Sequence, residues 1–326
     1  MSVIPSGRCT LITGAAGFIG STYANMAVAR YPYEHFVLLD CLTPVANINN
    51  LDKATIDAPN CTFEKVDIRD LDELRRVFGT HSITDIIHFA AETHVDASIA
   101  DPALFISTNV VGTHNLLSLS REYKTKRFHQ ISTDEVYGSL ESDDAPFSEA
   151  SPLMPNSPYS ASKAAGDHMV RAYNKTYGLD TVITRSSNNY GPRQDSTKLI
   201  PLFIYRLLDG KTVPLYGNGM NVRDWIFVDD NVEAIDTVFR NGITGEIYNI
   251  GGSYEQSNVD ITRALLALTD RMEDAIEFVA DRPGHDLRYS ILSDKVRALG
   301  WSPKTDFANG LAKTVEYYRN NQKATP

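Results

Sequence analysis

Short apolar runs alternate with amphipathic stretches through the first half of the chain. Each run is followed by polar or glycine-rich residues, which is typical of buried strands whose ends carry loops. We predict strands at 9–12, 36–40, 62–66, 85–90, 127–132 and 181–186. We predict helices between them, at 18–30, 71–78, 103–122 and 158–177. This alternation predicts an α/β fold built on a doubly wound, Rossmann-like parallel sheet.

A glycine-rich turn with the sequence T-G-A-A-G-F-I-G joins the first predicted strand to the first predicted helix. Gly14 permits the tight turn, Gly17 lets a pyrophosphate approach the helix N-terminus, and Gly20 allows close packing of helix on strand. Asp40 ends the second predicted strand, 20 residues after Gly20, where an acid can accept hydrogen bonds from a ribose. Because Cys41 rather than an arginine follows this acid, we expect NAD rather than NADP as the cofactor.

Two later segments carry groups that can transfer protons. Tyr159 and Lys163 lie at positions i and i+4 of a predicted helix and therefore share one face. An ammonium beside a phenol favours the phenolate, and a free phenol has a pKa of about 10. Asp134 and Glu135 follow a predicted strand and add two carboxyl groups. Each pair alone is more often a helix surface, a solvated loop or a cap, but the glycine turn and Asp40 upstream favour an enzyme site.

Composition argues against several other classes of protein. A formal net charge of −10 over 326 residues disfavours non-specific nucleic-acid binding. No apolar run approaches the roughly 20 residues of a membrane span, and no terminal segment resembles a signal peptide. The three cysteines lack C-x-x-C spacing, and the eight histidines lack metal-ligand spacing. We expect a cytoplasmic protein without disulfides or metal, in which His88 is packed and His94 lies in a loop that can line a pocket.

Together these segments resemble the extended short-chain dehydrogenase/reductases and, within them, the nucleoside-diphosphate-glucose 4,6-dehydratases. The glycine turn and the Tyr/Lys pair are shared with sugar 4-epimerases and decarboxylases, so the discriminating residue is Asp134. The resemblance spans nearly the whole chain. Its motifs are T-G-A-A-G-F-I-G from Thr13, A-A-E-T-H-V-D from Ala90, S-T-D-E-V-Y-G from Ser132, Y-S-A-S-K from Tyr159, N-N-Y-G-P from Asn188, R-D-W from Arg223 and R-P-G-H-D from Arg282.

The resemblance implies a three-step reaction on a nucleotide sugar. Tyr159 takes the proton of the 4-hydroxyl while C4 gives a hydride to NAD, with Lys163 supporting the phenolate and Thr133 bonded to the C4 oxygen. Glu135 then removes the C5 proton, and Asp134 protonates the departing C6 hydroxyl. Hydride finally returns to C6, which gives a 4-keto-6-deoxy sugar nucleotide. Two neighbouring carboxyls suit elimination because mutual repulsion raises one pKa and leaves an acid beside a base.

The resemblance also implies binding positions and an organisation. We expect an NAD-binding domain at 1–187 and a smaller α/β nucleotide-sugar-binding part at 188–326, from which one strand or helix can cross back. A homodimer is implied through helices near 103–122 and 162–177. The cofactor positions are Gly14, Gly17, Phe18, Ile19, Gly20, Asp40, Asp67, Ile68, Ala90, Ala91, Thr108, Tyr159 and Lys163. The substrate positions are Thr93, Asn188, Lys198, Leu199, Pro201, Tyr216, Arg223, Asn258, Arg282 and His285.

One segment departs from the family pattern. The run after Asp40 is C-L-T-P-V-A-N, where bacterial members usually read K-L-T-Y-A-G-N. The resemblance implies dTDP-glucose as the substrate, and because of this departure UDP-glucose stays open as the alternative. A UDP-sugar 4-epimerase would use Tyr159 and Lys163 but has no need of Asp134. A protein that only binds NAD would be expected to have lost Tyr159, Lys163 or Thr133.

Overall fold

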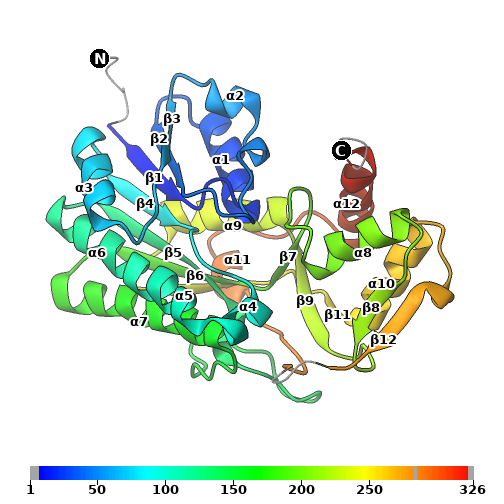
Figure 1. Cartoon of the computed structure of the whole chain (residues 1–326). Helices are drawn as coiled ribbons and strands as arrows, with labels where there is room; N and C mark the ends of the chain where they lie inside the picture. Colours follow the sequence, from blue (N-terminus) through cyan, green and yellow to red (C-terminus); the bar gives the residue numbers. More distant parts are fainter. Residues whose placement is uncertain (1–6, 282–284, 322–326) are drawn as a thin grey trace.

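The computed structural model describes residues 7–281 and 285–321. Its centre is a parallel sheet of seven strands in the order β10-β6-β5-β4-β1-β2-β3 (Figure 1). The six strands that the sequence predicts all lie in this sheet, which confirms the doubly wound α/β fold. Their bounds are β1 Cys9–Thr13, β2 His35–Asp40, β3 Cys61–Lys65, β4 Asp85–His88, β5 Arg127–Thr133 and β6 Thr181–Ser186, and β10 spans Ile247–Ile250.

Helices cover both faces of the sheet and bury one apolar cluster on each. On one face, α1 (Phe18–Arg30) and α9 (Val228–Asn241) enclose a core that includes Leu38, Ile87 and Ile235. On the other face, α3 (Leu71–Thr80), α6 (Thr113–Glu122) and α7 (Pro158–Tyr177) enclose a second core. Short helical segments lie in the connections. They are η1 Ile48–Asn50, α2 Lys53–Ile56, α4 Val95–Ala100, η3 Asp134–Tyr137 and α11 Asp294–Arg297.

The helix predicted at 103–122 is confirmed, but it is not an α-helix throughout. Helix α5 (Pro102–Ile106) and α6 are joined by a π-helical segment, Ser107–Gly112. Gly112 lies directly over Ile68, since a Cβ at Gly112 would be 2.6 Å from the Ile68 Cδ1 atom. Such wide turns frequently occur at functional sites. Hydrophobic periodicity does not register a single widened turn, so it cannot predict the π-helical segment.

The predicted strand at 85–90 is also two residues too long, because β4 ends at His88. Beyond it, the Ala90 amide donates to the Thr13 hydroxyl at 3.3 Å instead of continuing the ladder. The segment after β4 therefore passes close to Gly14 at the carboxyl edge of the sheet.

The rest of the chain forms a smaller mixed part. A three-stranded sheet has the order β11-β9-β7, and a two-stranded sheet pairs β12 with β8. A third apolar core lies between these sheets and their helices. The strands are β7 Asn188–Tyr190, β8 Val213–Tyr216, β9 Val222–Phe227, β11 Glu255–Ser257 and β12 Ile276–Val279, and the helices are α8 Leu199–Leu208, α10 Asn258–Leu268, η4 Glu273–Ala275 and α12 Phe307–Asn321.

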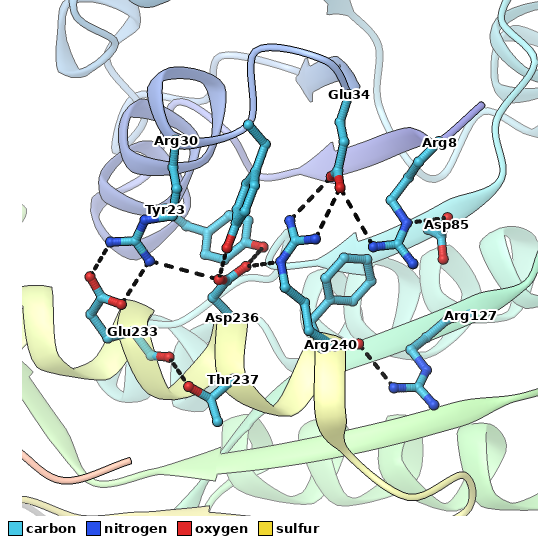
Figure 2. A network of polar contacts seen from close by, with 12 residues as sticks. Arg8, Tyr23, Arg30, Glu34, Asp85, Arg127, Glu233, Asp236, Thr237 and Arg240 are labelled. Atoms are coloured by element: carbon cyan, nitrogen blue, oxygen red, sulfur yellow. Dashed lines mark hydrogen bonds and ion pairs between the residues drawn. The ribbon is translucent and has the colours of Figure 1, made fainter. Parts of the chain in front are cut away.

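A buried polar network fastens α9 to the first βαβ unit (Figure 2). Asp236 accepts hydrogen bonds from the phenols of Tyr23 at 3.0 Å and Tyr31 at 2.5 Å, and from Arg240 at 3.1 Å. Arg240 also forms two hydrogen bonds with Glu34, at 3.0 and 3.1 Å. Residues that are far apart in the sequence therefore join α1, the turn before β2 and α9.

Over residues 7–281 and 285–321, no helix combines the length and apolar character that a membrane span requires.

Candidate active site

A cavity of about 330 Å³ opens at the carboxyl edge of the seven-stranded sheet. Such an edge is where ligands bind in open α/β sheets. The cavity brings together the five residues expected to be catalytic and all the residues expected to hold the cofactor. Its lining includes Gly14, Gly17, Phe18, Ile19, Gly20, Asp40, Asp67, Ile68, Ala90, Ala91, Thr108, Thr133, Asp134, Glu135, Tyr159 and Lys163.

The glycine turn is shaped by close backbone approaches. Gly14 has φ +68°, and a Cβ there would lie 2.6 Å from the Ala90 nitrogen. A Cβ at Gly20 would lie 2.1 Å from the Gly14 carbonyl oxygen. Both positions therefore exclude any side chain. The first turn of α1 consequently packs directly against the loop after β1. The backbone N–H groups of this turn lie at the cavity, as an anion-binding site requires.

Asp40 is buried at the end of β2 and held by two backbone amides. Its Oδ2 accepts from the Ala16 N–H at 2.9 Å, and its Oδ1 accepts from the Leu42 N–H at 2.8 Å. Burial raises the pKa of Asp40, and the two amides oppose this increase. Each carboxylate oxygen can accept a second hydrogen bond. The fixed carboxylate can therefore accept from the two hydroxyls of a ribose.

The first turn of α7 positions the Tyr/Lys pair. A capping box between Ser157 and Ser160 starts this helix. Lys163 is 5% exposed, and its Nζ donates to the Ile131 carbonyl at 2.7 Å. Burial lowers the pKa of Lys163 to about 8, and nearby Asp167 opposes that decrease.

Tyr159 is buried in the same region, and its pKa is raised. Burial is the main cause, and the charge of Glu135 raises the pKa further, whereas a hydrogen bond with Thr133 lowers it. The sequence led us to expect that Lys163 would favour the phenolate. In the structure the Lys163 ammonium is instead bonded to the Ile131 carbonyl, and burial and carboxylate charge raise the pKa of Tyr159. A further positive charge beside the phenol would favour its action as a base.

The two carboxyl groups leave β5 in a short 3-10 turn, η3. Thr133 caps this turn, and its hydroxyl accepts from the Glu135 N–H at 3.2 Å. Asp134 is 2% exposed, and its Oδ2 has no hydrogen-bond partner among the described residues. Burial, with the added charge of Glu135 and Asp224, raises the pKa of Asp134 well above its usual range. Asp134 is thus the member of the pair whose surroundings favour the protonated acid.

Three of the expected substrate residues also line the cavity, at its opening towards the C-terminal part. They are Thr93, Asn188 and Lys198. The Lys198 Nζ donates to the Thr93 carbonyl at 3.0 Å, which links the loop after β4 to the start of α8. The Asn188 Oδ1 is buried and has no partner within the described part of the chain.

Arg223 lies on β9 and is 5% exposed. Its guanidinium donates to the carbonyls of Val222 at 2.7 Å and Asp286 at 3.1 Å, and it stacks 4.2 Å above the centre of the Tyr289 ring. Asp224, the next residue of the R-D-W motif, accepts from the Tyr254 N–H at 2.7 Å.

The remaining expected substrate residues lie on C-terminal elements, outside the described lining of the cavity. Tyr216 and His285 lie edge to face with ring centres 6.3 Å apart, and Arg282 falls outside the described residues. The other three occupy helix starts. They are Leu199 and Pro201 in the first turn of α8, and Asn258, the first residue of α10. Leu199 packs against the C-terminal core, and Pro201 is buried.

Several lining residues were not identified from the sequence. Glu92, Arg69, Ser187 and Gln194 border the cavity. Arg69 forms hydrogen bonds with Asp67, and burial raises the pKa of Glu92. Glu92 and Arg69 directly follow residues that were identified, so the position of their loops at strand ends was the available signal. Ser187 directly follows β6, so it carried the same strand-end signal, whereas Gln194 reaches the site only through the fold of the C-terminal part.

The two singled-out histidines lie as expected. His94 lines the cavity. His88 is buried and hydrogen-bonded to Thr13 at 2.7 Å and Thr113 at 3.1 Å. Among the described residues, no group of three or more His, Cys, Asp or Glu side chains is arranged to hold a metal ion.

A doubly wound sheet with this glycine turn, a strand-end acid and a buried Tyr/Lys pair defines an extended short-chain dehydrogenase/reductase. More narrowly, the chain belongs to the GDP-mannose 4,6 dehydratase family, whose model matches residues 11–314.

Relatives within this class include dehydratases and epimerases. The chain is 46% identical to the dTDP-glucose 4,6-dehydratase of Neisseria meningitidis serogroup B, across 97% of this chain and 94% of that protein. A dTDP-glucose 4,6-dehydratase from Streptomyces venezuelae, solved with NAD bound, has a TM-score of 0.92 and 47% identity, across 97% of this chain and 98% of that one. A UDP-glucose 4-epimerase from Thermus thermophilus, in complex with NAD, has a TM-score of 0.89 and 32% identity, across 96% and 99% of the two chains.

Proposed function

We propose that this protein is a dTDP-glucose 4,6-dehydratase, a hydro-lyase that converts dTDP-glucose to dTDP-4-keto-6-deoxyglucose. The observation that carries the proposal is the Asp134/Glu135 pair beside Tyr159. Elimination of water requires an acid and a base at once, and burial provides the acid by keeping Asp134 protonated. An epimerase needs neither group for its chemistry.

The cofactor that fits the site is NAD. Gly17 leaves room for a pyrophosphate at the start of α1, whose position the close packing at Gly14 and Gly20 sets, and Asp40 can accept from the ribose hydroxyls. Cys41 follows Asp40, so the position directly after the acid offers no cation for a 2′-phosphate. When bound, NAD accepts a hydride from the sugar and later returns it. Its oxidised ring also supplies positive charge, which lowers the pKa of a neighbouring phenol.

Tyr159 and Thr133 act on the sugar C4 oxygen in this proposal. The Tyr159 phenolate takes the 4-hydroxyl proton while Thr133 holds that oxygen. Lys163, anchored on the Ile131 carbonyl, keeps positive charge near the phenol. The resulting ketone acidifies the C5 hydrogen.

The carboxyl pair then removes water across C5 and C6. Glu135 takes the C5 proton, and Asp134 gives its proton to the departing C6 hydroxyl. Asp134 suits this role because it is buried and carries a raised pKa, whereas Glu135 is only half-buried. Glu135 then returns the proton to C5 as C6 is reduced.

The experiment that tests this function is NMR analysis of the product in D2O, with dTDP-glucose and UDP-glucose supplied in parallel. The proposal predicts a 4-keto-6-deoxy product that carries deuterium at C5. Faster turnover of UDP-glucose would reassign the nucleotide. A 4-epimer that retains hydrogen at C5 would refute the dehydratase function and leave the NAD site intact.

We further propose that the protein is a homodimer. Ile106 and Val111, in and after α5, are 56% and 47% exposed, and Ile99 on α4 is 49% exposed. Leu116, Leu117 and Val170 from the two predicted interface helices are buried core instead. Val111→Glu should shift the sedimentation coefficient to that of a monomer, whereas Ile243→Glu, at a residue that is 64% exposed after α9, should not. Equal sedimentation of both variants and the wild type would contradict this interface.

The domain division and the cellular location remain proposals as well. We place the boundary at residue 187, with 188–326 as the substrate-binding part, although α9 and β10 return to the seven-stranded sheet. The three cysteines are unpaired, which supports a reducing, cytoplasmic environment. Limited proteolysis would test the boundary by its fragments, and cell fractionation would test the location.

A further inference from the structure

The proton balance of the proposed reaction leaves two side chains altered after each turnover. Tyr159 gains the O4 proton, which the product ketone does not take back. Asp134 loses the proton that leaves with the C6 hydroxyl as water. Glu135 takes a proton from C5 and returns one to C5, so it ends unchanged. One proton must therefore leave Tyr159 and one must reach Asp134 before the next turnover.

Thr133 lies between these two groups. Its hydroxyl donates to the Asp134 Oδ1 at 3.3 Å and accepts from the Glu135 N–H at 3.2 Å. It also hydrogen-bonds the phenol of Tyr159. A hydroxyl has one proton to donate and two lone pairs to accept. The Glu135 amide uses one lone pair, so the second is free to accept from a protonated phenol while the Thr133 proton is donated to the Asp134 carboxyl.

We propose that Thr133 is a proton bridge that returns the proton of Tyr159 to Asp134 after each turnover. This inference rests on the proposed function. The O–H bond of Tyr159 breaks as its proton passes to the Thr133 oxygen. The O–H bond of Thr133 breaks at the same time, and its proton passes to the Asp134 carboxylate. A phenolate base and a neutral carboxylic acid result, with no change of oxidation state in either residue.

Burial explains why an internal path is useful. Asp134 is 2% exposed and Tyr159 is 7% exposed, so neither group exchanges protons readily with bulk water. Both groups have raised pKa values, mainly because of burial. A cation beside the phenol lowers the pKa of the phenol and moves the shared proton towards Asp134. The bridge thus couples positive charge at the cofactor position to protonation of the acid.

The test compares wild type, Thr133→Val and Thr133→Ser by rapid-quench measurement of product in the NAD-loaded enzyme. Thr133→Val retains shape and loses the hydroxyl. It should form about one product per site, because Asp134 can take a proton from solvent before mixing. Its steady-state rate should then fall at least ~10-fold below the burst rate, since positioned proton transfer typically contributes about 10²–10⁴-fold. A small carboxylic acid in the buffer should accelerate the steady state but not the burst.

Thr133→Ser restores the hydroxyl and should show no burst. Equal slowing of the first and later turnovers in Thr133→Val, without buffer rescue, would overturn the bridge and leave Thr133 as a contact to the sugar oxygen. Wild type that forms no 4-keto-6-deoxy product would refute the proposed function instead.

Infrared spectroscopy of the NAD-loaded enzyme provides a second measurement, which follows Asp134 itself after substrate is added. The carbonyl stretch of protonated Asp134, assigned by its loss in Asp134→Asn, should be present before mixing and persist during turnover in wild type. In Thr133→Val the band should be lost with the first turnover and return slowly. A band retained equally in both proteins during turnover would overturn the proposal.

Discussion

The strongest stability prediction concerns Asp236, the centre of the network that fastens α9 to α1. The side chain of Asp236 is 7% exposed and takes hydrogen bonds from Tyr23, Tyr31 and Arg240. Removing one partner of a buried ion pair typically costs about 3–5 kcal/mol. Because Arg240 would keep its two hydrogen bonds to Glu34, the loss should be near the lower end of that range. We expect Asp236→Ala to lower the free energy of unfolding by about 3 kcal/mol.

Urea denaturation followed by circular dichroism measures this difference, and the chain offers a matched control one turn earlier on α9. Glu233 pairs with Arg30, but their side chains are 35% and 38% exposed. Exposed pairs contribute about 0–1 kcal/mol, so Glu233→Ala should unfold near the wild-type midpoint (Figure 2). If Asp236→Ala lost no more stability than Glu233→Ala, the argument from burial would be refuted.

Three further predictions concern the cofactor site, the reaction and pH. Gly20→Ala should abolish NAD binding measured by calorimetry, because its Cβ would lie 2.1 Å from the Gly14 oxygen. The control Gly79→Ala should bind NAD normally, because its Cβ would meet nothing closer than 4.0 Å. Glu135→Gln should slow product formation about 10²–10⁴-fold and accumulate bound NADH, seen by absorbance; absence of that signal would contradict its role as the C5 base. Burial lowers the pKa of His88 and of His129 to about 3, against an unfolded value near 6.5. Below pH 6.5 the unfolded state binds more protons than the folded state, so the free energy of unfolding should be at its full value above that pH. As the pH decreases towards 3, each of the two histidines should lower it by up to about 1.4 kcal/mol per pH unit. Urea midpoints that stay constant from pH 7 to about 5 would contradict this.

Much of the fold could be predicted because its signals are local. Each predicted strand is a short apolar run, and the glycine turn, Asp40 and the Tyr/Lys pair each occupy a few adjacent positions. Strand ends meet at one edge of a parallel sheet, so the cavity follows once the strands are known. The π-helical turn at Ser107–Gly112 escaped prediction because its cause is tertiary: Gly112 packs on Ile68, from a different loop.

The chemical states of the site residues depend on contacts that the sequence does not reveal. The sequence suggested that Glu135 would raise the pKa of Asp134, and the structure agrees, but burial is the larger cause. That burial involves β9, whose Asp224 raises the pKa further and whose Arg223 lowers it. Likewise, Lys163 is anchored on the Ile131 carbonyl of β5 rather than acting on Tyr159 through helical spacing alone. The C-terminal part therefore helps to set the acid of the proposed reaction, and Arg223→Met, which removes an opposing charge, should raise the pKa of Asp134 further without touching the glycine turn.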